Sequence, residues 1–364
     1  TTQAQLQGYL NSIYLSCVPV GTIQSGSQGG GFSQAQMPFS GLSDESVWRS
    51  NYIYWNYYPD AMATSSESSI AKFYTAQYNC IRNCNRIMAN YQSVFMTDTA
   101  LQHRYAVEAR ALRAYAHFQL YMFFGPIPII TTAVALPNAG NLARGSEDSV
   151  TNFIVTELDT CAAYLPATYP QSDVYRITSG ACYAIIMKLY LQQHNYAKAI
   201  EYAQKIINSN VYSLYKTTAA GRNSYSDLFG YNALNNSEFI ITFSLGSAGA
   251  FFRYAPLSLG GQAGISPTAA MINTYETLQG KTLQELGSDS LNIYWADPLY
   301  KNNRDPRLFA SILVPGERFS GTTLGFNTAA DPLGGVGSTF TGYWCKKYVD
   351  STDKSSHPGK INFG

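Results

Sequence analysis

Apolar residues recur at three- and four-residue steps over three segments in the first third of the chain, which is the spacing of one face of an α-helix. This pattern predicts helices over residues 2–15, 69–91 and 101–124. The last of them must end at Gly125-Pro126, because proline has no backbone N–H to continue the helical hydrogen bonds.

A shorter pair of helices is predicted over residues 181–193 and 197–208. The second one carries the small residues Ala199 and Ala203, which let a partner helix approach closely, as in the second helix of a tetratricopeptide unit. One such pair cannot bury its own apolar face, so we expect the other helices to stack against it.

The helical pattern weakens beyond residue 210, where Gly, Pro and Asn become frequent. Residues 238–243 alternate enough to predict a short strand, and residues 266–277 a short helix. We therefore expect a mainly α fold with tetratricopeptide-like helix pairs and a loop-rich lobe with few short strands. The expected organisation is a single domain over residues 1–364, with a helical scaffold lobe over 1–230 and an irregular lobe over 231–364.

The composition excludes several classes of protein. The 364 residues hold 24 Lys+Arg and 23 Asp+Glu, and this balance without basic clusters argues against a nucleic-acid partner. The apolar share of 46% is enough for a large core, which excludes a disordered chain. No apolar run reaches the roughly 18 residues that a membrane-spanning helix needs. The 29 tyrosines are unusual, and each offers an apolar face with one hydroxyl, which suits both packing and ligand recognition.

Motifs for catalysis and for metal binding are absent from the sequence. It contains no His-Glu-x-x-His, no Gly-x-Ser-x-Gly and no EF-hand spacing, so we expect no metal, no cofactor and no enzyme activity. The six cysteines are scattered, and Cys80 and Cys84 have no histidine nearby, so we interpret them as buried thiols rather than metal ligands.

A glycoside hydrolase would need two carboxylates facing each other across a cleft. The acids that flank the aromatic stretch could serve, but nothing in their spacing selects a pair, and solvated loop acids are the favoured interpretation. These acids are Asp44, Glu45, Asp60 and Glu67.

The aromatic stretch itself, residues 48–58, reads Trp-Arg-Ser-Asn-Tyr-Ile-Tyr-Trp-Asn-Tyr-Tyr. Aromatic faces can stack on sugar rings while neighbouring polar side chains bind hydroxyls, but alternating aromatics can equally pack a core. Both interpretations remain open, with Trp48 favoured as core and Tyr52, Tyr54 and Trp55 as surface.

Several blocks of sequence, in order, resemble the SusD/RagB family of nutrient-binding outer-membrane lipoproteins. Residues 78–85 read Tyr-Asn-Cys-Ile-Arg-Asn-Cys-Asn, and residues 108–115 read Glu-Ala-Arg-Ala-Leu-Arg-Ala-Tyr before Phe-Phe-Gly-Pro-Ile-Pro at 123–128. Ser-Pro-Thr at 266–268, Asn-Thr-Tyr-Glu at 273–276 and Arg-Asp-Pro-Arg at 304–307 follow.

The resemblance implies a SusD-like fold and a non-enzymatic, surface-exposed lipoprotein of a Gram-negative outer membrane. Such a protein binds an oligomeric nutrient, most often a glycan, and delivers it to a SusC-like TonB-dependent transporter. A peptide ligand is the alternative within the family, and a glycoside hydrolase is the alternative outside it. The lipid-bearing N-terminal cysteine and the final helix pair of the family have no counterpart here, so we expect a chain shortened at both ends.

The resemblance also directs attention to two segments that face the ligand in the family. Starch-binding members carry an Asp-Glu-x-x-Trp motif followed by ligand aromatics, matched here by residues 44–48, but Ser50 stands where those members have an aromatic. The second segment precedes the Ser-Pro-Thr block and includes Phe251. The predicted ligand contacts are Asn51, Tyr52, Tyr54, Trp55, Phe252, Arg253 and Tyr254.

Overall fold

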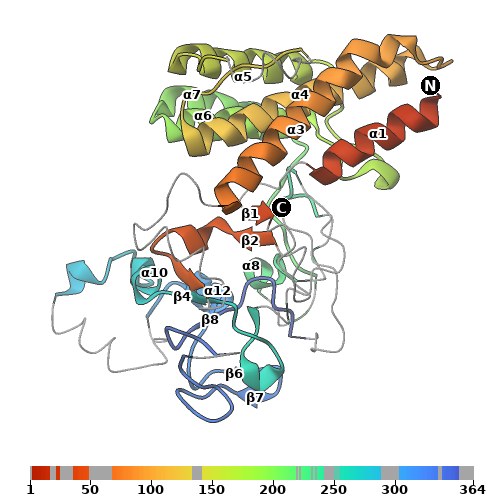
Figure 1. Cartoon of the computed structure of the whole chain (residues 1–364). Helices are drawn as coiled ribbons and strands as arrows, with labels where there is room; N and C mark the ends of the chain where they lie inside the picture. Colours follow the sequence, from red (N-terminus) through yellow and green to blue (C-terminus); the bar gives the residue numbers. More distant parts are fainter. Residues whose placement is uncertain are drawn as a thin grey trace.

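The structure, a computed structural model, describes residues 2–16, 22–24, 36–48, 68–132, 142–218, 220, 223–230, 233, 236–241, 251, 254–287, 303–334 and 338–351. The long helices lie together in one part of the molecule, and the short strands and helices lie together in the other (Figure 1). The mainly α fold expected from the sequence is confirmed.

The long helices are α1 (Gln3–Ser16), α3 (Ser68–Asn90), α4 (Thr99–Phe124), α5 (Glu147–Ala162), α6 (Ser179–Gln192) and α7 (Tyr196–Asn208). All but α5 were predicted, with ends that differ by at most two residues. Helix α5 was not predicted from the sequence, although the Ser146 side chain caps it by accepting a hydrogen bond from Ser149 N. Its buried positions, Val150, Ile154 and Leu158, also follow a helical spacing.

These helices pack in sequence order, α3 on α4, α4 on α5, α5 on α6 and α6 on α7, while α1 lies against α3 and α4. Ala109 and Ala116 have no exposed surface and Ala199 is 6% exposed, so small residues do stand at the helix contacts. Ala203 is half-buried. At the end of α4, Gly125 has a φ of +64°, a conformation that glycine adopts without strain.

The other part consists of two-stranded antiparallel ladders and single helical turns. The strands pair as β1 (Thr22–Gln24) with β2 (Gln36–Pro38), β3 (Ser46–Trp48) with β4 (Ile265–Pro267), β5 (Ile312–Leu313) with β8 (Trp344–Cys345), and β6 (Arg318–Phe319) with β7 (Thr322–Thr323). The short α-helices are α8 (Ser224–Asp227), α10 (Ala269–Thr274) and α12 (Pro306–Ser311). The 3-10 turns of this part are η1 (Phe39–Leu42), η7 (Leu257–Leu259) and η8 (Gln284–Leu286), whereas η3 (Tyr91–Ser93) and η5 (Gln171–Asp173) contact the long helices.

Two local predictions are corrected. The described part of the predicted strand over 238–243, residues 238–241, contains a turn and a bend and no strand, and residues 242 and 243 lie outside the described residues. Ile240 and Ile241 pack instead against the helical core. The predicted helix over 266–277 is helical only from Ala269 to Thr274, because its first residues belong to β4 and Thr268 is the N-cap. The division into lobes at residue 230 stays a prediction, and the pairing of β3 with β4 joins the two ranges.

Candidate functional site

The two segments that the sequence analysis singled out are joined by the β3–β4 ladder. Trp48 stands opposite Ile265, and Ser46 stands opposite Pro267. The hydroxyl of Thr268 donates to the carbonyl oxygen of Asp44, 224 residues earlier, at 2.5 Å, and Thr268 N donates to Glu45 O at 3.0 Å. The Asp-Glu-x-x-Trp motif and the Ser-Pro-Thr block are therefore in direct contact.

The antiparallel register decides which ends of these segments meet. Trp48 is the last residue of β3, and its partner Ile265 is the first residue of β4. The chain therefore leaves β3 and enters β4 at the same end of the ladder. We call this the open end of the β3–β4 ladder. The predicted ligand segments are thus connected to one place in the fold.

A closed loop connects Tyr254 to the start of β4. Ala263 N donates to Ala255 O at 3.0 Å, and Gly261 N donates to Pro256 O at 2.9 Å, so residues 255–263 fold back on themselves. A Cβ atom at Gly261 would lie 2.1 Å from Ala255 O, which leaves room for glycine alone.

The predicted contacts differ in what the structure says of them. Asn51, Tyr52, Tyr54, Trp55, Phe252 and Arg253 lie outside the described residues. The ring of Tyr254 is 4% exposed, and that of Phe251 is 2% exposed. Tyr254 is therefore an interior residue, in contrast to the exposed ring expected from the sequence. Asp44 and Glu45 are exposed, as expected of solvated loop acids.

Residues near the end of the described chain hold β4 in position. The hydroxyl of Ser266 accepts hydrogen bonds from Thr339 Oγ1 at 3.0 Å and from Phe340 N at 3.3 Å. Ser266 and Thr339 are both buried, so each hydrogen bond replaces one to water that the group has lost. Sequence reasoning missed Thr339, which no motif marks.

The Arg-Asp-Pro-Arg block supports the next element, α10. Arg304 is 2% exposed and donates from Nη2 to Ile272 O at 2.7 Å and to Tyr275 O at 2.9 Å, which satisfies carbonyl groups at the end of that helix. Asp305 caps α12 by accepting a hydrogen bond from Arg307 N, and Pro306 takes the first helical position.

In the scaffold, a buried polar cluster connects α3, α4 and α5. Arg113 donates from Nη1 to Asn85 Oδ1 at 2.8 Å and from Nη2 to Glu157 Oε2 at 2.6 Å. Arg110 binds the same carboxylate through two nitrogens. Burial acts to raise the pKa of Glu157, but the hydrogen bonds from Arg110 and Arg113 outweigh it and hold the pKa below its usual value.

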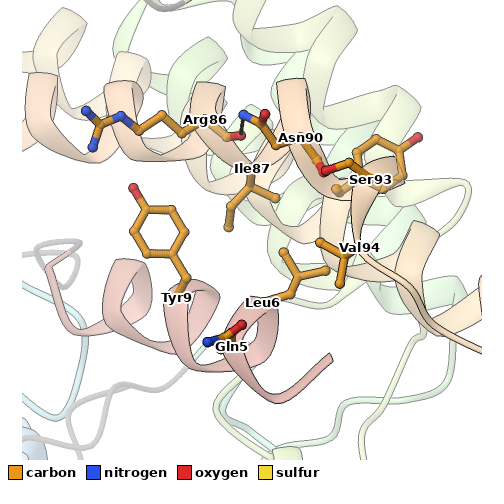
Figure 2. A pocket seen from close by; sticks show the side chains of 9 residues that line it. Gln5, Leu6, Tyr9, Arg86, Ile87, Asn90, Ser93 and Val94 are labelled. Atoms are coloured by element: carbon orange, nitrogen blue, oxygen red, sulfur yellow. Dashed lines mark hydrogen bonds between the residues drawn. The ribbon is translucent and has the colours of Figure 1, made fainter. Parts of the chain in front are cut away.

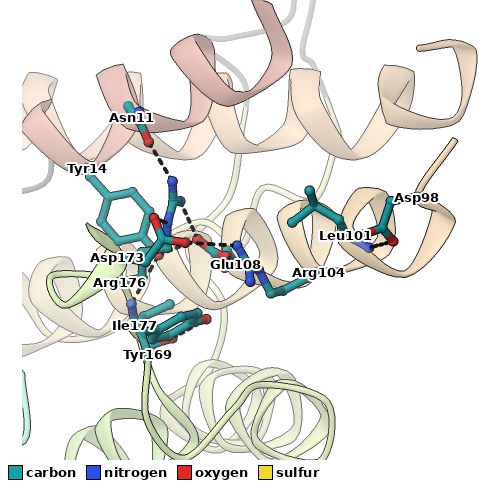
Figure 3. A network of polar contacts seen from close by, with 10 residues as sticks. All are labelled: Asn11, Tyr14, Asp98, Leu101, Arg104, Glu108, Tyr169, Asp173, Arg176 and Ile177. Atoms are coloured by element: carbon teal, nitrogen blue, oxygen red, sulfur yellow. Dashed lines mark hydrogen bonds and ion pairs between the residues drawn. The ribbon is translucent and has the colours of Figure 1, made fainter. Parts of the chain in front are cut away.

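A second polar cluster attaches α1 to the rest of the scaffold (Figure 3). The carboxylate of Glu108, with no exposed surface, accepts hydrogen bonds from Tyr14 Oη at 2.8 Å and from Arg176 Nη1 at 2.9 Å. Arg176 also donates to Asn11 of α1 at 3.0 Å. Burial raises the pKa of Glu108 above its usual value, against the opposing charge of Arg176.

Neither cluster has the features of a catalytic or metal centre. Their carboxylates are held by arginines and buried, which leaves no approach for a substrate. Within the described part of the chain, no three His, Cys, Asp or Glu side chains converge on a point where they could hold a metal ion. In the same part, Cys80, Cys84, Cys161 and Cys182 are buried free thiols and Cys345 is a half-buried one.

Comparison with known protein families covers nearly the whole chain. Residues 2–191, more than half of it, match the family described as "Starch-binding associating with outer membrane", and residues 204–362 match the "SusD family". The chain belongs to the SusD/RagB family. The resemblance read from the sequence blocks is thereby confirmed.

Individual relatives within the SusD/RagB family are distant. A SusD-like protein of Formosa agariphila is 24% identical over 172 residues, which are 47% of this chain and 31% of that protein. A SusD-like protein of Bacteroides ovatus is 24% identical over 210 residues, 53% of this chain and 37% of that protein. The matches thus span about a third of the length of these curated relatives.

Solved structures of the family share the fold. A SusD-like carbohydrate-binding protein of Bacteroides fragilis superposes with a TM-score of 0.80 at 20% identity, covering 99% of this chain and 71% of that one. For this SusD/RagB protein, the blocks that carried the resemblance now have a physical role. Asn85, Arg113 and Glu108 hold the scaffold together, and Thr268 and Arg304 shape the surroundings of the β3–β4 ladder.

Proposed function

We propose that this SusD/RagB protein binds an oligomeric glycan at the cell surface, without cleaving it, and delivers it to a SusC-like TonB-dependent transporter of the outer membrane. The observation that carries the proposal is the β3–β4 ladder, which connects both predicted ligand segments to its open end. Recognition loops held by a rigid scaffold are the usual arrangement for ligand binding.

The comparisons support a glycan as the ligand class. The solved relative from Bacteroides fragilis is a carbohydrate-binding protein. A solved laminarin-binding SusD-like protein superposes on the chain with a TM-score of 0.66 at 18% identity, covering 100% of this chain and 77% of that one. A peptide ligand and a hydrolase remain as outcomes of the experiments below.

The proposed contacts are aromatic side chains with polar neighbours. Tyr52, Tyr54 and Trp55 would stack on sugar rings, with Phe252 beside them and Asn51 and Arg253 as hydrogen-bond donors to hydroxyl groups. Stacking of this kind contributes about 1–2 kcal/mol per ring. Tyr254 would support the segment from inside, because its ring is buried.

Outer-membrane attachment is the second part of the proposal. The family description places its members at the outer membrane, and we propose that the whole protein is held there by an N-terminal lipid. In the described ranges, no helix has both the length and the apolar character needed to cross a bilayer. Crosslinking of intact outer membranes followed by pull-down should recover a large TonB-dependent transporter, and its absence would contradict this part.

A binding screen tests the glycan-binding part. The chain is titrated with a panel of oligosaccharides and a panel of peptides, and each mixture is assayed for new reducing ends. We expect binding to one glycan class with no new reducing ends. Binding of peptides alone would contradict a glycan as the ligand. Cleavage that is abolished by substitution of one acidic residue would contradict binding without catalysis.

A matched pair of variants tests the proposed site. Trp55→Ala should weaken glycan binding about tenfold or more while the melting temperature changes little. Tyr196→Ala removes an aromatic ring that is 58% exposed on α7, far along the chain from the ladder, and should leave binding unchanged. A sharp fall in melting temperature for Trp55→Ala would identify that ring as core.

A further inference from the structure

A hollow of about 460 Å³ lies on the scaffold, between α1 and the end of α3 with the turn η3 (Figure 2). Its volume falls within the roughly 300–1,000 Å³ of small-molecule sites. It is lined by Gln5, Leu6, Tyr9, Arg86, Ile87, Asn90, Tyr91, Ser93 and Val94. None of these elements takes part in the β3–β4 ladder.

The walls of the hollow are fixed by hydrogen bonds from outside it. Gln102 of α4 donates from Nε2 to Tyr91 O at 2.8 Å and to Val94 O at 2.6 Å, which fixes the η3 turn. On the opposite side, Tyr9 Oη donates to Asn83 Oδ1 at 2.9 Å, which fixes the position of the Tyr9 ring. A ligand would therefore meet a largely preformed surface, with little ordering entropy to lose.

The lining combines an apolar floor with a polar edge. Leu6 of α1 faces Ile87 and Val94, all three with less than 6% of their surface exposed, and Tyr9 adds an aromatic face (Figure 2). Amide and hydroxyl groups come from Gln5, Asn90 and Ser93. This combination suits a ring with one apolar face and several hydroxyls, which is a sugar.

The charge of the residues that line the hollow favours sugars with a negatively charged group. Arg86 is the one charged residue among the nine, no carboxylate lines the hollow, and the side chain of Arg86 is exposed. The ion pairs of the described residues do not include Arg86, so its guanidinium is available to a ligand. A guanidinium binds planar carboxylates and sulfates through two parallel hydrogen bonds.

We propose that this hollow binds a sugar unit that carries an anionic group, a carboxylate or a sulfate, as a second site separate from the open end of the β3–β4 ladder. Arg86 pairs with the anion, Tyr9 packs on the sugar face, and Asn90 and Gln5 bind hydroxyls. The proposal does not depend on which glycan, if any, the ladder binds.

Titration calorimetry with three small probes tests the proposal: methyl β-D-glucuronide, glucose 6-sulfate and the neutral methyl β-D-glucoside. We expect at least one anionic sugar to bind about three- to fivefold more tightly than the neutral one, with the difference reduced by salt. Preference for only one of the two anionic sugars identifies the anion and supports the proposal. Equal binding of all three, or no binding, overturns it.

Two arginine variants of α3 provide the matched comparison. Arg86→Gln should lower the affinity for the anionic sugars to that of the neutral one. Arg82→Gln removes an exposed arginine one turn earlier on the same helix, outside the hollow, and should keep the preference. Equal loss in both variants would mean a general charge effect and would overturn the proposal. A thermal melt of each variant checks that both are folded.

Discussion

Arg113 Nη1 donates a 2.8 Å hydrogen bond to the side-chain oxygen of Asn85 on the neighbouring helix, and both residues are less than 5% exposed. The two belong to separate sequence blocks that carry the family resemblance. Asn85 also binds the backbone after α4, because its Nδ2 donates to Ile130 O at 3.3 Å and to Thr132 O at 3.1 Å. This cluster fixes the segment that follows α4.

Removal of Arg113 should be costly. Arg113→Met leaves the buried Asn85 oxygen without this donor and the Glu157 carboxylate with Arg110 alone, so the free energy of unfolding should fall by about 3–5 kcal/mol. Urea denaturation followed by circular dichroism measures it. Arg110→Met is the control, because Arg110 is 32% exposed, and should cost clearly less. Equal losses would contradict a central role for Arg113.

The hydroxyl of Tyr14 should matter for the attachment of α1. It donates to Glu108 at 2.8 Å and accepts from Ile177 N at 3.1 Å. Tyr14→Phe therefore leaves Ile177 N without this acceptor and removes one donor from the buried Glu108 carboxylate, which keeps its hydrogen bond from Arg176. We expect a loss of about 1–3 kcal/mol and faster hydrogen exchange in α1. Tyr196→Phe, on an exposed ring, should change stability by less than about 0.5 kcal/mol. Unchanged exchange in α1 would show that other contacts hold it.

His117 should make stability depend on pH. Its Nε2 accepts from Ile130 N at 3.2 Å, so the neutral ring carries its proton on Nδ1 and donates it to Arg113 O at 2.8 Å. Burial lowers the pKa of His117 from 6.5 to about 4. Between these pH values the unfolded state therefore binds a proton that the folded state does not. The stability that neutral His117 contributes is complete above pH 6.5 and is lost as the pH falls towards 4.

The expected loss across this window is roughly 3 kcal/mol. Urea denaturation at a series of pH values measures it. His117→Gln should flatten the dependence between pH 4 and 6.5, whereas His103→Gln, at an exposed position, should keep it. A slope that is the same in all three proteins would show that other groups cause it.

Gly261 should tolerate no side chain. In Gly261→Ala the new Cβ would meet Ala255 O at 2.1 Å, so the loop over residues 255–263 must open, and glycan binding at the ladder should weaken together with stability. Gly8→Ala is the control, because nothing lies within 4 Å of a Cβ there and alanine favours the α1 helix by about 0.5–1 kcal/mol. Both are measured by thermal melts and glycan titration. Normal binding by Gly261→Ala would separate the loop from the site.

The sequence predicted all the long helices except α5, because each of them buries an apolar face that local spacing reveals. Helix α5 was missed although Val150, Ile154 and Leu158 have the same spacing. Failures came where tertiary contacts decide. Residues 238–243 were predicted to form a strand, but Ile240 and Ile241 pack on the helical core. The β3–β4 ladder could not be predicted from pattern, since each strand has three residues and their surroundings are joined by the contact between Asp44 and Thr268 across 224 positions. The aromatic stretch over residues 48–58 was proposed as a ligand surface from its own residues, and the segment around residues 251–254 from the family resemblance. Both stay predictions.

The distance that the β3–β4 ladder spans along the chain also sets an order of events in folding. The long helices find their main partners within residues 3–208, so the scaffold can fold as soon as that part has left the ribosome. The strand β3 cannot pair until β4 has been synthesised, because its partner Ile265 comes much later in the chain. Closing the long loop between the two strands also costs conformational entropy. A nascent chain stopped before residue 265 would thus have a folded scaffold without the β3–β4 ladder. If the proposed site is correct, ligand binding would arise only when synthesis has passed that point.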